Sequence, residues 1–469
     1  MLNTRTGLLF LLMLASSSAV LGADFAPGEV LVKYKEGVTR GRAQVNSFYD
    51  SIGVQSVHRF SDQDSGFEQL VLDEEDNVEA VLERLRKNDS VEYAQPNYIF
   101  HILPVLSKES QESLESQESL ESEEECAPLG SLSFFSSCKL LGLVRGGKGR
   151  PRPVVRPEIH SLVSAEIPYQ ADPKLSRLYG IAKVGALAAW SISKGNKSVI
   201  VADIDTGVDY NHEDLAFNMW RNPNPSHGDL VGYDFVHKDG LPYDDNEHGT
   251  HIAGTIGAVG GNGVGISGIN QRVSLMAIKF MSKGGDGSTA DAIRAIDYAV
   301  SHGAKVLSNS WGSPGEGANN QLLRDAIERA KAKDILFITA AGNEGADNDG
   351  PQADFPAAFA MDNQISVAAT DSNDELPSFS NYGKRTTHLA APGVDIYSTV
   401  PGGKYKPMSG SSMACPHVAG AAALLWSVHP DWNYKQIKTA LLNSVDRLPG
   451  LADKVMSSGR LNIDRALRE

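Results

Sequence analysis

The sequence predicts an α/β protein whose main domain is a mostly parallel sheet sandwiched by helices, with a small α+β domain before it. Apolar, strand-like runs alternate with helical stretches in the second half of the chain. The strand-like runs are 199–204, 274–278, 306–308 and 335–340, and the helical stretches are 291–301 and 320–331. This alternation is typical of a parallel sheet covered on both faces. The 45 glycines suit the tight turns of such a fold, and the length of 469 residues predicts two or three domains.

The first 23 residues have the pattern of a secretory signal peptide. Arg5 precedes an apolar run at 7–15, and small residues follow up to Ala23. The apolar run is too short to span a bilayer, and no cysteine follows it closely enough for a lipoprotein anchor. We therefore expect an exported protein, extracellular or periplasmic, without a membrane anchor.

Residues 24–103 are expected to form a small ferredoxin-like domain with the order strand, helix, strand, strand, helix, strand. Residues 29–34 and 67–72 alternate between apolar and polar, and 91–103 supplies the closing strand. The second helix has apolar residues at the i, i+3, i+4, i+7 spacing of one buried face. These residues are Val78, Val81, Leu82 and Leu85.

The composition of residues 104–170 predicts a solvated linker. The hexapeptide Glu-Ser-Gln-Glu-Ser-Leu repeats from Glu109 and from Glu115, and a basic half rich in glycine and proline follows. Cys126 and Cys138 lie in this segment, and the sequence leaves open whether they pair. The net charge of -15 argues against a nucleic-acid partner.

Four polar residues lie where strands end or helices begin. Asp205 closes the first strand-like run, His248 opens a helix of small residues, and Asn343 follows the last strand-like run. Ser412 precedes a long apolar segment and would lie at the hydrogen-bond-donating end of a helix. A serine before a helix is usually only a cap. However, the strand ends of open α/β sheets are where catalytic groups gather.

These four motifs, in this chain order, resemble those of the subtilisin-like serine proteases over roughly residues 172–469. The resemblance implies a serine endopeptidase that hydrolyses peptide bonds of protein or peptide substrates through an acyl-enzyme. Ser412 would be the nucleophile, His248 the general base, and Asp205 the residue that orients the imidazole. The Asn343 side chain and the Ser412 backbone N–H would hold the oxyanion.

Two other classes of protein fit the sequence less well. An α/β-hydrolase esterase needs Gly-x-Ser-x-Gly, but Ala414 stands where the second glycine belongs. A catalytically inactive binding protein would be expected to lack a residue of the triad, and all three are present. His251 does not form a zinc-protease pair with His248, because His-x-x-His lacks the Glu and the i, i+4 spacing of that motif.

The domain at 24–103 resembles the propeptide of the same family. The segment from Glu92 to Tyr98 (Glu-Tyr-Ala-Gln-Pro-Asn-Tyr) matches the final strand of that propeptide, whose tail lies in the active-site cleft. The resemblance implies that the propeptide is a partner of the enzyme, first as folding catalyst and inhibitor, and is later cleaved away. Residues 171–469 would then be the peptidase domain, which we expect to be a monomer.

The same resemblance implies a structural calcium ion, Ca²⁺. Asp214 lies nine residues after the predicted catalytic aspartate, and the loop that begins at Asn262 resembles the calcium loop of the family. That loop would supply the Asn262 side chain and the carbonyl groups of Val264 and Ile266, and Asp172 would add a carboxylate. The alternative is a glycine-rich turn beside a surface aspartate.

The resemblance also indicates which residues bind the substrate. They are Ser310, Trp311, Gly312, Gly342, Glu344 and Asp354. Asp354 would form the base of the pocket for the side chain before the scissile bond, with Glu344 at the rim. A carboxylate enclosed there favours Lys or Arg. The alternative is that Asp354 bends outward, as acidic loop residues usually do.

The expected site of propeptide removal departs from the family pattern. Leu103, where the propeptide would end, is followed by Pro104, so the first cut is expected in the linker. Arg145 and Lys148 are each followed by glycine and are the candidate processing sites, whereas the linker arginines after them precede proline.

Asp203 is unusual, because the proteins that the chain resembles have an apolar residue at this position. Alternation along the strand puts it on the same face as Asp205. An unpaired buried carboxylate is costly. Either Asp203 therefore has a partner that the sequence does not reveal, or the strand turns it towards solvent.

Overall fold

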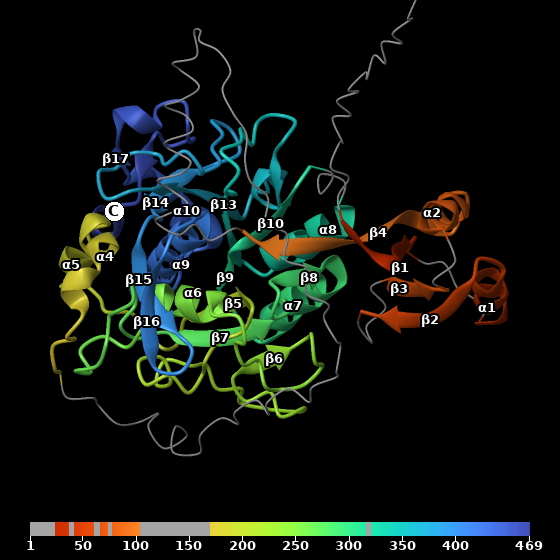
Figure 1. Cartoon of the computed structure of the whole chain (residues 1–469), viewed down its shortest axis with the longest axis horizontal. Coiled ribbons are helices and arrows are strands. Elements are labelled where there is room, and N and C mark those ends of the chain that lie inside the picture. The colour runs from red at the N-terminus through yellow and green to blue at the C-terminus, as the bar shows by residue number, and fades with distance from the viewer. Residues whose placement is uncertain (1–23, 37–41, 61–65, 74–76, 104–168, 316–319) are drawn as a thin grey trace, which may run out of the picture.

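The computed structural model describes a small N-terminal domain and a larger domain, shown together in Figure 1. The described residues are 24–36, 42–60, 66–73, 77–103, 169–315 and 320–469. The predicted signal peptide and nearly all of the predicted linker, with Cys126, Cys138, Arg145 and Lys148, lie outside the described residues. Within those ranges, no helix has the length and apolar character needed to cross a membrane.

The small domain has the predicted order of strands and helices. Its elements are β1 (Phe25–Tyr34), α1 (Arg42–Ser51), β2 (Val54–Arg59), β3 (Phe67–Leu72), α2 (Val78–Arg86) and β4 (Val91–Ile102). The strands form an antiparallel sheet in the order β4-β1-β3-β2. The predicted apolar face of α2 packs on this sheet, because Val81, Leu82 and Leu85 share a buried core with Val30 and Leu70.

The large domain is built on a nine-stranded sheet with the order β17-β18-β14-β13-β11-β9-β5-β7-β6. Every neighbouring pair is parallel except β17 with β18. The strands are β5 (Ile200–Asp205), β6 (Gly232–Asp234), β7 (Ser274–Lys279), β9 (Val306–Asn309), β11 (Leu336–Ala340), β13 (Gln364–Thr370), β14 (Leu389–Pro392), β17 (Asp446–Arg447) and β18 (Gly459–Arg460). A separate hairpin consists of β15 (Ile396–Val400) and β16 (Lys404–Met408).

Helices cover both faces of this sheet, as predicted. On one face are α4 (Tyr179–Lys183), α5 (Ala186–Ala189), α6 (His248–Gly257), α9 (Ser411–Val428), α10 (Tyr434–Asn443) and α11 (Ile463–Ala466), and on the other are α7 (Thr289–Ser301) and α8 (Gln321–Ala332). In β5, Val201 belongs to the core under α6 and α9, whereas Ala202 and Ile204 belong to the core under α7 and α8. Because the sheet is buried on both faces, its strands are continuous apolar runs in the sequence.

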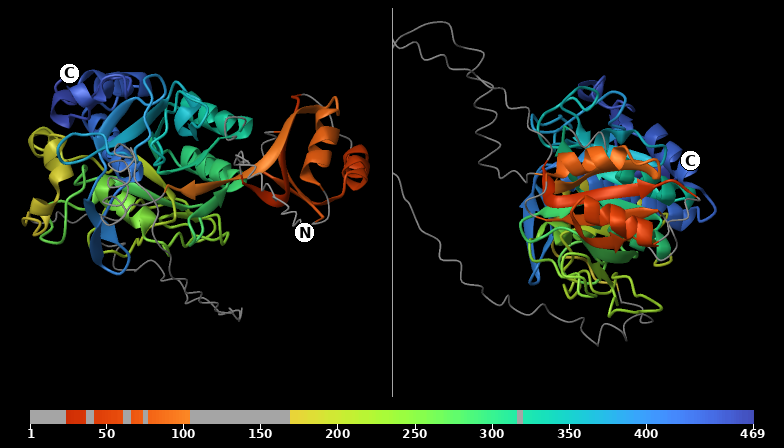
Figure 2. Two further views of the ribbon diagram at one scale, coloured as in Figure 1. Left: turned by 45° about the horizontal axis from the view of Figure 1, so that its top comes forward. Right: turned by 90° about the vertical axis from the view of Figure 1, so that its right-hand side faces the viewer.

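One strand of the small domain enters the large domain. The strand β4 lies between β8 (Asp286–Ser288) and β10 (Trp311–Pro314) and is antiparallel to both. Figures 1 and 2 show this strand, in orange, reaching from the small domain into the large one. On its other side, β10 pairs with β12 (Asp354–Phe355). One hydrogen-bonded sheet therefore runs from β12 through β10 and β4 into the small domain.

The middle of β4 also contacts the amino ends of two helices. Asn97 accepts a hydrogen bond from the backbone N–H of Ala290, in the first turn of α7, at 2.9 Å. Gln95 accepts one from the backbone N–H of Leu322, in the first turn of α8, at 3.2 Å. The first N–H groups of a helix have no partner within the helix. The two buried amide side chains therefore satisfy donors of the large domain as well as fixing the position of β4.

Candidate active site

Asp205 and His248 meet at the carboxyl edge of the nine-stranded sheet. Asp205 is the last residue of β5, and His248 is the first residue of α6. The Nδ1 atom of His248 lies 2.8 Å from Oδ1 and 3.0 Å from Oδ2 of Asp205, and both side chains are buried. A contact of this kind fixes which ring nitrogen carries the proton. The other nitrogen, Nε2, has no hydrogen-bond partner within the described ranges, so it is available to accept a proton.

Asp244 holds this arrangement in place, and sequence reasoning missed it. Its buried carboxylate accepts hydrogen bonds from the Thr206 hydroxyl at 3.0 Å and from the backbone N–H and hydroxyl of Thr250 at 2.9 and 2.6 Å. The Thr206 hydroxyl accepts one from the backbone N–H of Gly249 at 2.9 Å. Asp244 thus ties the residue after β5 to the first turn of α6. The signal in the sequence is an acidic residue one turn before the His-Gly-Thr motif.

Ser412 is the second residue of α9, at the helix end where the sequence predicts it. Its hydroxyl donates to the Ser310 carbonyl at 3.2 Å, and the Ser310 hydroxyl donates to the Ser412 carbonyl at 3.0 Å. The Ser412 hydroxyl therefore points at Ser310 in this structure. Rotation about its Cα–Cβ bond would redirect it, and catalytic hydrogen bonds are often formed only when substrate is bound.

Asn343 follows β11 and lies against the first turn of α9. Its Oδ1 atom accepts a hydrogen bond from the backbone N–H of Ser411 at 2.8 Å. Its Nδ2 atom lies 3.0 Å from the ideal Cβ position of Gly410, and the Ser412 backbone nitrogen lies 3.6 Å from the same point. Both nitrogens are hydrogen-bond donors, and both therefore lie close to Gly410, the residue before the first turn of α9.

Two family models match this chain. The model described as Subtilase family matches residues 196–463, and the model described as Fervidolysin N-terminal prodomain matches residues 15–97. The first match covers more than half of the chain. The chain belongs to the subtilase family.

Similar proteins include thermitase of Thermoactinomyces vulgaris, which is 40% identical over 63% of this chain and 98% of thermitase. A thermophilic serine proteinase of Bacillus sp. (strain AK1) is 31% identical over 93% of this chain and 86% of its own length. Subtilisin NAT of Bacillus subtilis subsp. natto is 37% identical over 56% of this chain and 64% of its own length. The predicted family, fold class and enzyme class are confirmed: this subtilase is a serine endopeptidase with an N-terminal prodomain.

The predicted substrate-binding residues of the subtilase lie in three places. Ser310, Trp311 and Gly312 lie at or just before the start of β10, Gly342 and Glu344 lie in the loop after β11, and Asp354 lies in β12. Trp311 lies opposite Ile102 of the prodomain strand β4, and Gly312 lies opposite His101. The Trp311 ring also contacts the ring of Phe100, with 4.9 Å between the ring centroids. The prodomain thus adds an extended strand to β10, as peptides do when they bind at the edge of a sheet.

Asp354 faces inward, so the alternative in which it bends outward is wrong. It is 0% exposed, and a Cβ atom on Gly312 would lie 2.0 Å from its Oδ1 atom. Neither carboxylate oxygen has a hydrogen-bond partner within the described ranges. Burial, and then the charge of Glu344, raises the pKa of Asp354 well above its usual value. Glu344 is exposed, and its Oε2 atom accepts a hydrogen bond from the backbone N–H of Asn343 at 2.9 Å and lies 2.8 Å from the ideal Cβ position of Gly342.

The residues predicted to bind calcium lie together around one loop. Asp214 accepts hydrogen bonds from the Asn262 side chain at 2.9 Å and from the backbone N–H of Ile266 at 2.8 Å. Asp172 accepts one from the backbone N–H of Asn262 at 3.1 Å, and the Asn262 side chain accepts one from the backbone N–H of Val264 at 2.8 Å. Asp214 is fully buried, so the alternative of a surface aspartate is wrong.

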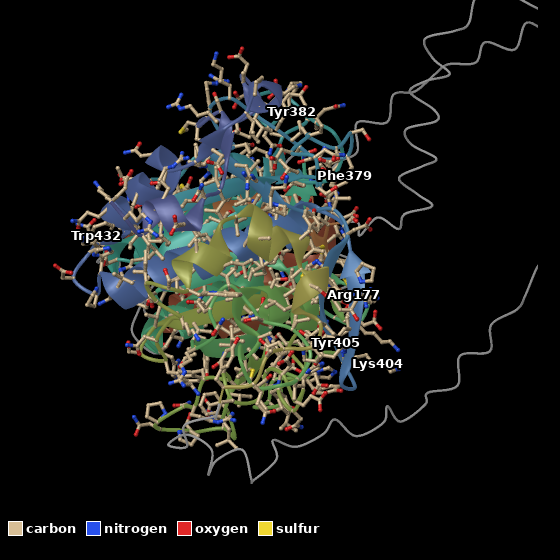
Figure 3. The ribbon with its side chains drawn as sticks, turned by 90° about the vertical axis from the view of Figure 1, so that its left-hand side faces the viewer. Arg177, Phe379, Tyr382, Lys404, Tyr405 and Trp432 are labelled. Atoms are coloured by element: carbon tan, nitrogen blue, oxygen red, sulfur yellow. The ribbon has the colours of Figure 1, made fainter. Side chains whose placement is uncertain are left out.

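The environment of this loop disfavours two negative charges. Burial raises the pKa of Asp214 to about 7, and the charge of Asp172 also raises it. The Tyr405 hydroxyl, 3.3 Å from Asp214, belongs to the hairpin strand β16, and Figure 3 labels Tyr405 on this side of the molecule. In the part of the chain that the structure describes, no group of three or more His, Cys, Asp or Glu could hold a metal. Amide and carbonyl oxygens would therefore have to complete a calcium site.

Both predicted alternatives for Asp203 are wrong. Asp203 is 1% exposed, and within the described ranges neither of its carboxylate oxygens has a hydrogen-bond partner. It lies inside the sheet, opposite Ala277 of β7 and Ser308 of β9. Burial, together with the charges of Asp205 and Asp244, raises the pKa of Asp203 well above its usual value. Retaining its proton is what allows a carboxyl group to remain there without a counter-charge.

Replacing Asp203 by valine should change how stability depends on pH. The unfolded chain releases this proton near pH 4, whereas the native state holds it to higher pH. Native stability is therefore lost as pH rises from about 4 towards the raised native pKa. The loss is about 1.4 kcal/mol for each unit by which the native pKa of Asp203 exceeds its pKa in the unfolded chain. The free energy of unfolding of Asp203→Val, measured relative to the chain with Asp203, should therefore be higher at pH 8 than at pH 4. The measurement is urea unfolding of full chains that also carry Ser412→Ala, with Asp203→Asn as the isosteric control; parallel pH dependence of all three chains would contradict it.

Proposed function

We propose that this subtilase is an exported endopeptidase in which Asp205, His248 and Ser412 are the catalytic triad. The observation that carries the proposal is the contact of both Asp205 oxygens with Nδ1 of His248, because it leaves Nε2 without a partner among the described residues. The predicted signal peptide at 1–23 supports export, and secretion would place the enzyme outside the cell or in the periplasm.

The reaction begins when Oγ of Ser412 attacks the carbonyl carbon of the scissile bond and its proton passes to Nε2 of His248. Asp205 stabilises the imidazolium that forms. The carbonyl oxygen becomes an oxyanion beside the Asn343 side-chain amide and the Ser412 backbone N–H. As the C–N bond breaks, Nε2 returns the proton to the leaving amine, and an acyl-enzyme remains. Water then repeats the same proton transfers and releases the acid product.

The prodomain is proposed to act as the inhibitor of its own enzyme. The backbone N–H of Ile102 donates to the Gly285 carbonyl at 2.8 Å, while Ile102 also pairs with Trp311 of β10. An extended substrate would need the same partners, so the prodomain strand and a substrate exclude one another. We assign 24–103 to the prodomain and 171–469 to the peptidase domain, with cleavage in the linker at Arg145 or Lys148.

Ser412→Ala should accumulate as the uncleaved full chain, because maturation is proposed to be autocatalytic. The readout is gel mobility and N-terminal sequencing after expression in a host without related proteases. Ser427→Ala is the matched control on the same helix, since among the described residues its hydroxyl bonds to the Leu424 carbonyl and to the Ser193 hydroxyl. Normal maturation of Ser412→Ala under these conditions would rule out self-processing.

We also propose that the loop carrying Asn262 binds a structural calcium ion. Asp172, Asp214 and the Asn262 side chain would hold it together with the Val264 and Ile266 carbonyl groups, which are the hard oxygen ligands that calcium takes. The fit is supported by the two carboxylates brought to one loop and by the raised pKa of Asp214, because a cation would offset both charges. Its contribution would be to stability, since the loop supplies no group to the triad.

Removing calcium should lower the thermal inactivation temperature of the mature enzyme. An ion that binds only the native state adds about 2.7 kcal/mol at a concentration one hundred times its Kd. Without the ion, Asp214 retains its proton up to about pH 7, so the effect of calcium should be larger at pH 8 than at pH 5.5. Asp214→Asn should reduce the response to chelator, whereas Glu213→Gln, at the exposed neighbouring position, should retain it. Equal responses of both variants would exclude this site.

Lys or Arg is the proposed residue before the scissile bond. The buried carboxyl of Asp354 beside Gly312, with Glu344 nearby, would form charge-assisted hydrogen bonds with a cationic side chain. Such a side chain would also supply the counter-charge that Asp354 lacks within the described ranges.

A peptide library on the mature enzyme tests this preference. Asp354→Asn should lower kcat/KM for Lys and Arg substrates by about 30-fold or more, since loss of one partner of a buried charge pair costs at least about 2 kcal/mol. Asp347→Asn, an exposed acid of the same loop region, should leave the preference unchanged. A library in which large apolar residues are preferred, with no effect of Asp354→Asn, would show the pocket assignment to be wrong.

A further inference from the structure

Lys279 is a lysine buried inside the large domain, beside the backbone of Asp205. It is the last residue of β7, it is 0% exposed, and its Cα partner in the neighbouring strand β5 is Asp205. Burying an ammonium group is costly unless hydrogen bonds and a counter-charge replace the water that it loses. No step of the proposed reaction uses this cation, so its hydrogen-bond partners indicate what it does.

All three N–H groups of the Lys279 ammonium have an acceptor. Nζ donates to the Thr206 carbonyl at 2.7 Å, to Oδ1 of Asp245 at 2.8 Å and to the Met281 carbonyl at 2.8 Å. A lysine side chain has three donors, so this set leaves none unused. The acceptors belong to three separate segments of the chain, which are the residue after β5, the loop before α6 and the loop after β7.

Each of these three segments leads directly to the contact between Asp205 and His248. Thr206 follows Asp205 in the chain, and Asp245 lies three residues before His248. The backbone N–H of Met281 donates to the Asp205 carbonyl at 3.3 Å. The buried ammonium group therefore joins the strand end that carries the aspartate to the loop that leads to the histidine.

Lys279 complements the role of Asp244 in the same region. The Asp244 carboxylate accepts a hydrogen bond from the Thr206 hydroxyl at 3.0 Å, whereas Lys279 donates to the Thr206 carbonyl. A carboxylate can hold only donors, and a carbonyl group needs a donor of its own. Because an anion and a cation hold Thr206 through different groups, the peptide that follows Asp205 has little freedom to turn.

We propose that Lys279 is a positioning residue for the reaction. Its ammonium group fixes the Asp205 backbone relative to the loop before His248, and thereby directs the Asp205 carboxylate at Nδ1. The inference rests on the proposed function in one respect, the assignment of Asp205 and His248 to the triad. Catalytic groups displaced by about 1 Å can lose about 100-fold in rate. Loss of the cation should therefore lower kcat while leaving KM nearly unchanged.

The first measurement compares Lys279→Met with Lys305→Met in the mature enzyme. Both changes replace lysine by an apolar side chain of similar length, but Lys305 lies just before β9, at the amino edge of the sheet, and pairs with Asp334 at 3.3 Å. Lys279→Met should lower kcat for a peptide substrate by about 10- to 100-fold and change KM by less than about threefold. Lys305→Met should change neither constant by more than about twofold.

The second measurement needs neither maturation nor activity. In full chains that also carry Ser412→Ala, NMR detects the proton between Nδ1 of His248 and Asp205, which resonates far downfield because a carboxylate holds it. Lys279→Met should move this resonance upfield and speed its exchange with water. Asp245→Ala removes the one exposed acceptor, so it should have the same effect to a smaller extent. It should add nothing in a chain that already carries Lys279→Met.

Several outcomes would overturn the proposal. Equal kcat values for Lys279→Met and Lys305→Met would show that the cation does not position the pair. A lower urea midpoint of Lys279→Met with an unchanged downfield resonance would show that the cation only stabilises the fold. If Lys279→Met does not fold, Asp245→Ala decides, and an unchanged resonance in that chain rejects the inference.

Asp205→Asn separates these failures from a failure of the proposed triad. An Asp205→Asn enzyme with undiminished kcat would reject the triad itself. An inactive Asp205→Asn enzyme, together with an unaffected Lys279→Met enzyme, would reject only the role of Lys279.

Discussion

The geometry of the candidate triad depends on the hydrogen bonds that the buried carboxylate of Asp244 accepts. It accepts hydrogen bonds from Thr206, which follows β5, and from Thr250 in the first turn of α6. Backbone N–H groups of Asn246 and Glu247 bond to the same carboxylate at 2.9 Å. A charge buried in this way is stable only because several donors surround it. The donors come from both sides of the contact between β5 and α6, so the orientation of His248 towards Asp205 is set before any substrate binds.

The catalytic candidates were predictable because each follows from a local pattern. Asp205 ends an apolar strand run, and His248 and Ser412 begin helices of small residues, so a short window of sequence is sufficient to place each of them. Asp244 was missed for the opposite reason. Its importance arises from donors on two separate elements, and its one local signal, the place one turn before the His-Gly-Thr motif, does not reveal those donors.

The sequence could not predict which way two acidic side chains point or whether they have a hydrogen-bond or ionic partner. Asp354 could face either way until its strand, β12, was seen to pair with β10 and to direct the carboxyl group at Gly312. Asp203 was expected to have a partner or to reach water, and it has neither within the described ranges. In both cases long-range packing decides, and the energetic cost is met by a raised pKa rather than by a neighbouring cation.

The position of β4 between β8 and β10 has a consequence for what the mature enzyme can digest. Once the prodomain has gone, two strand edges face one another across a gap that fits a single fully extended chain with its backbone groups unpaired. Helices, and strands already paired in a sheet, cannot meet that requirement without first coming apart. With substrates bound in this gap, as proposed, the enzyme would discriminate between protein targets by their conformational state. Loose tails and transiently unfolded segments would be cut, while a compact native protein would be degraded only as fast as it locally opens.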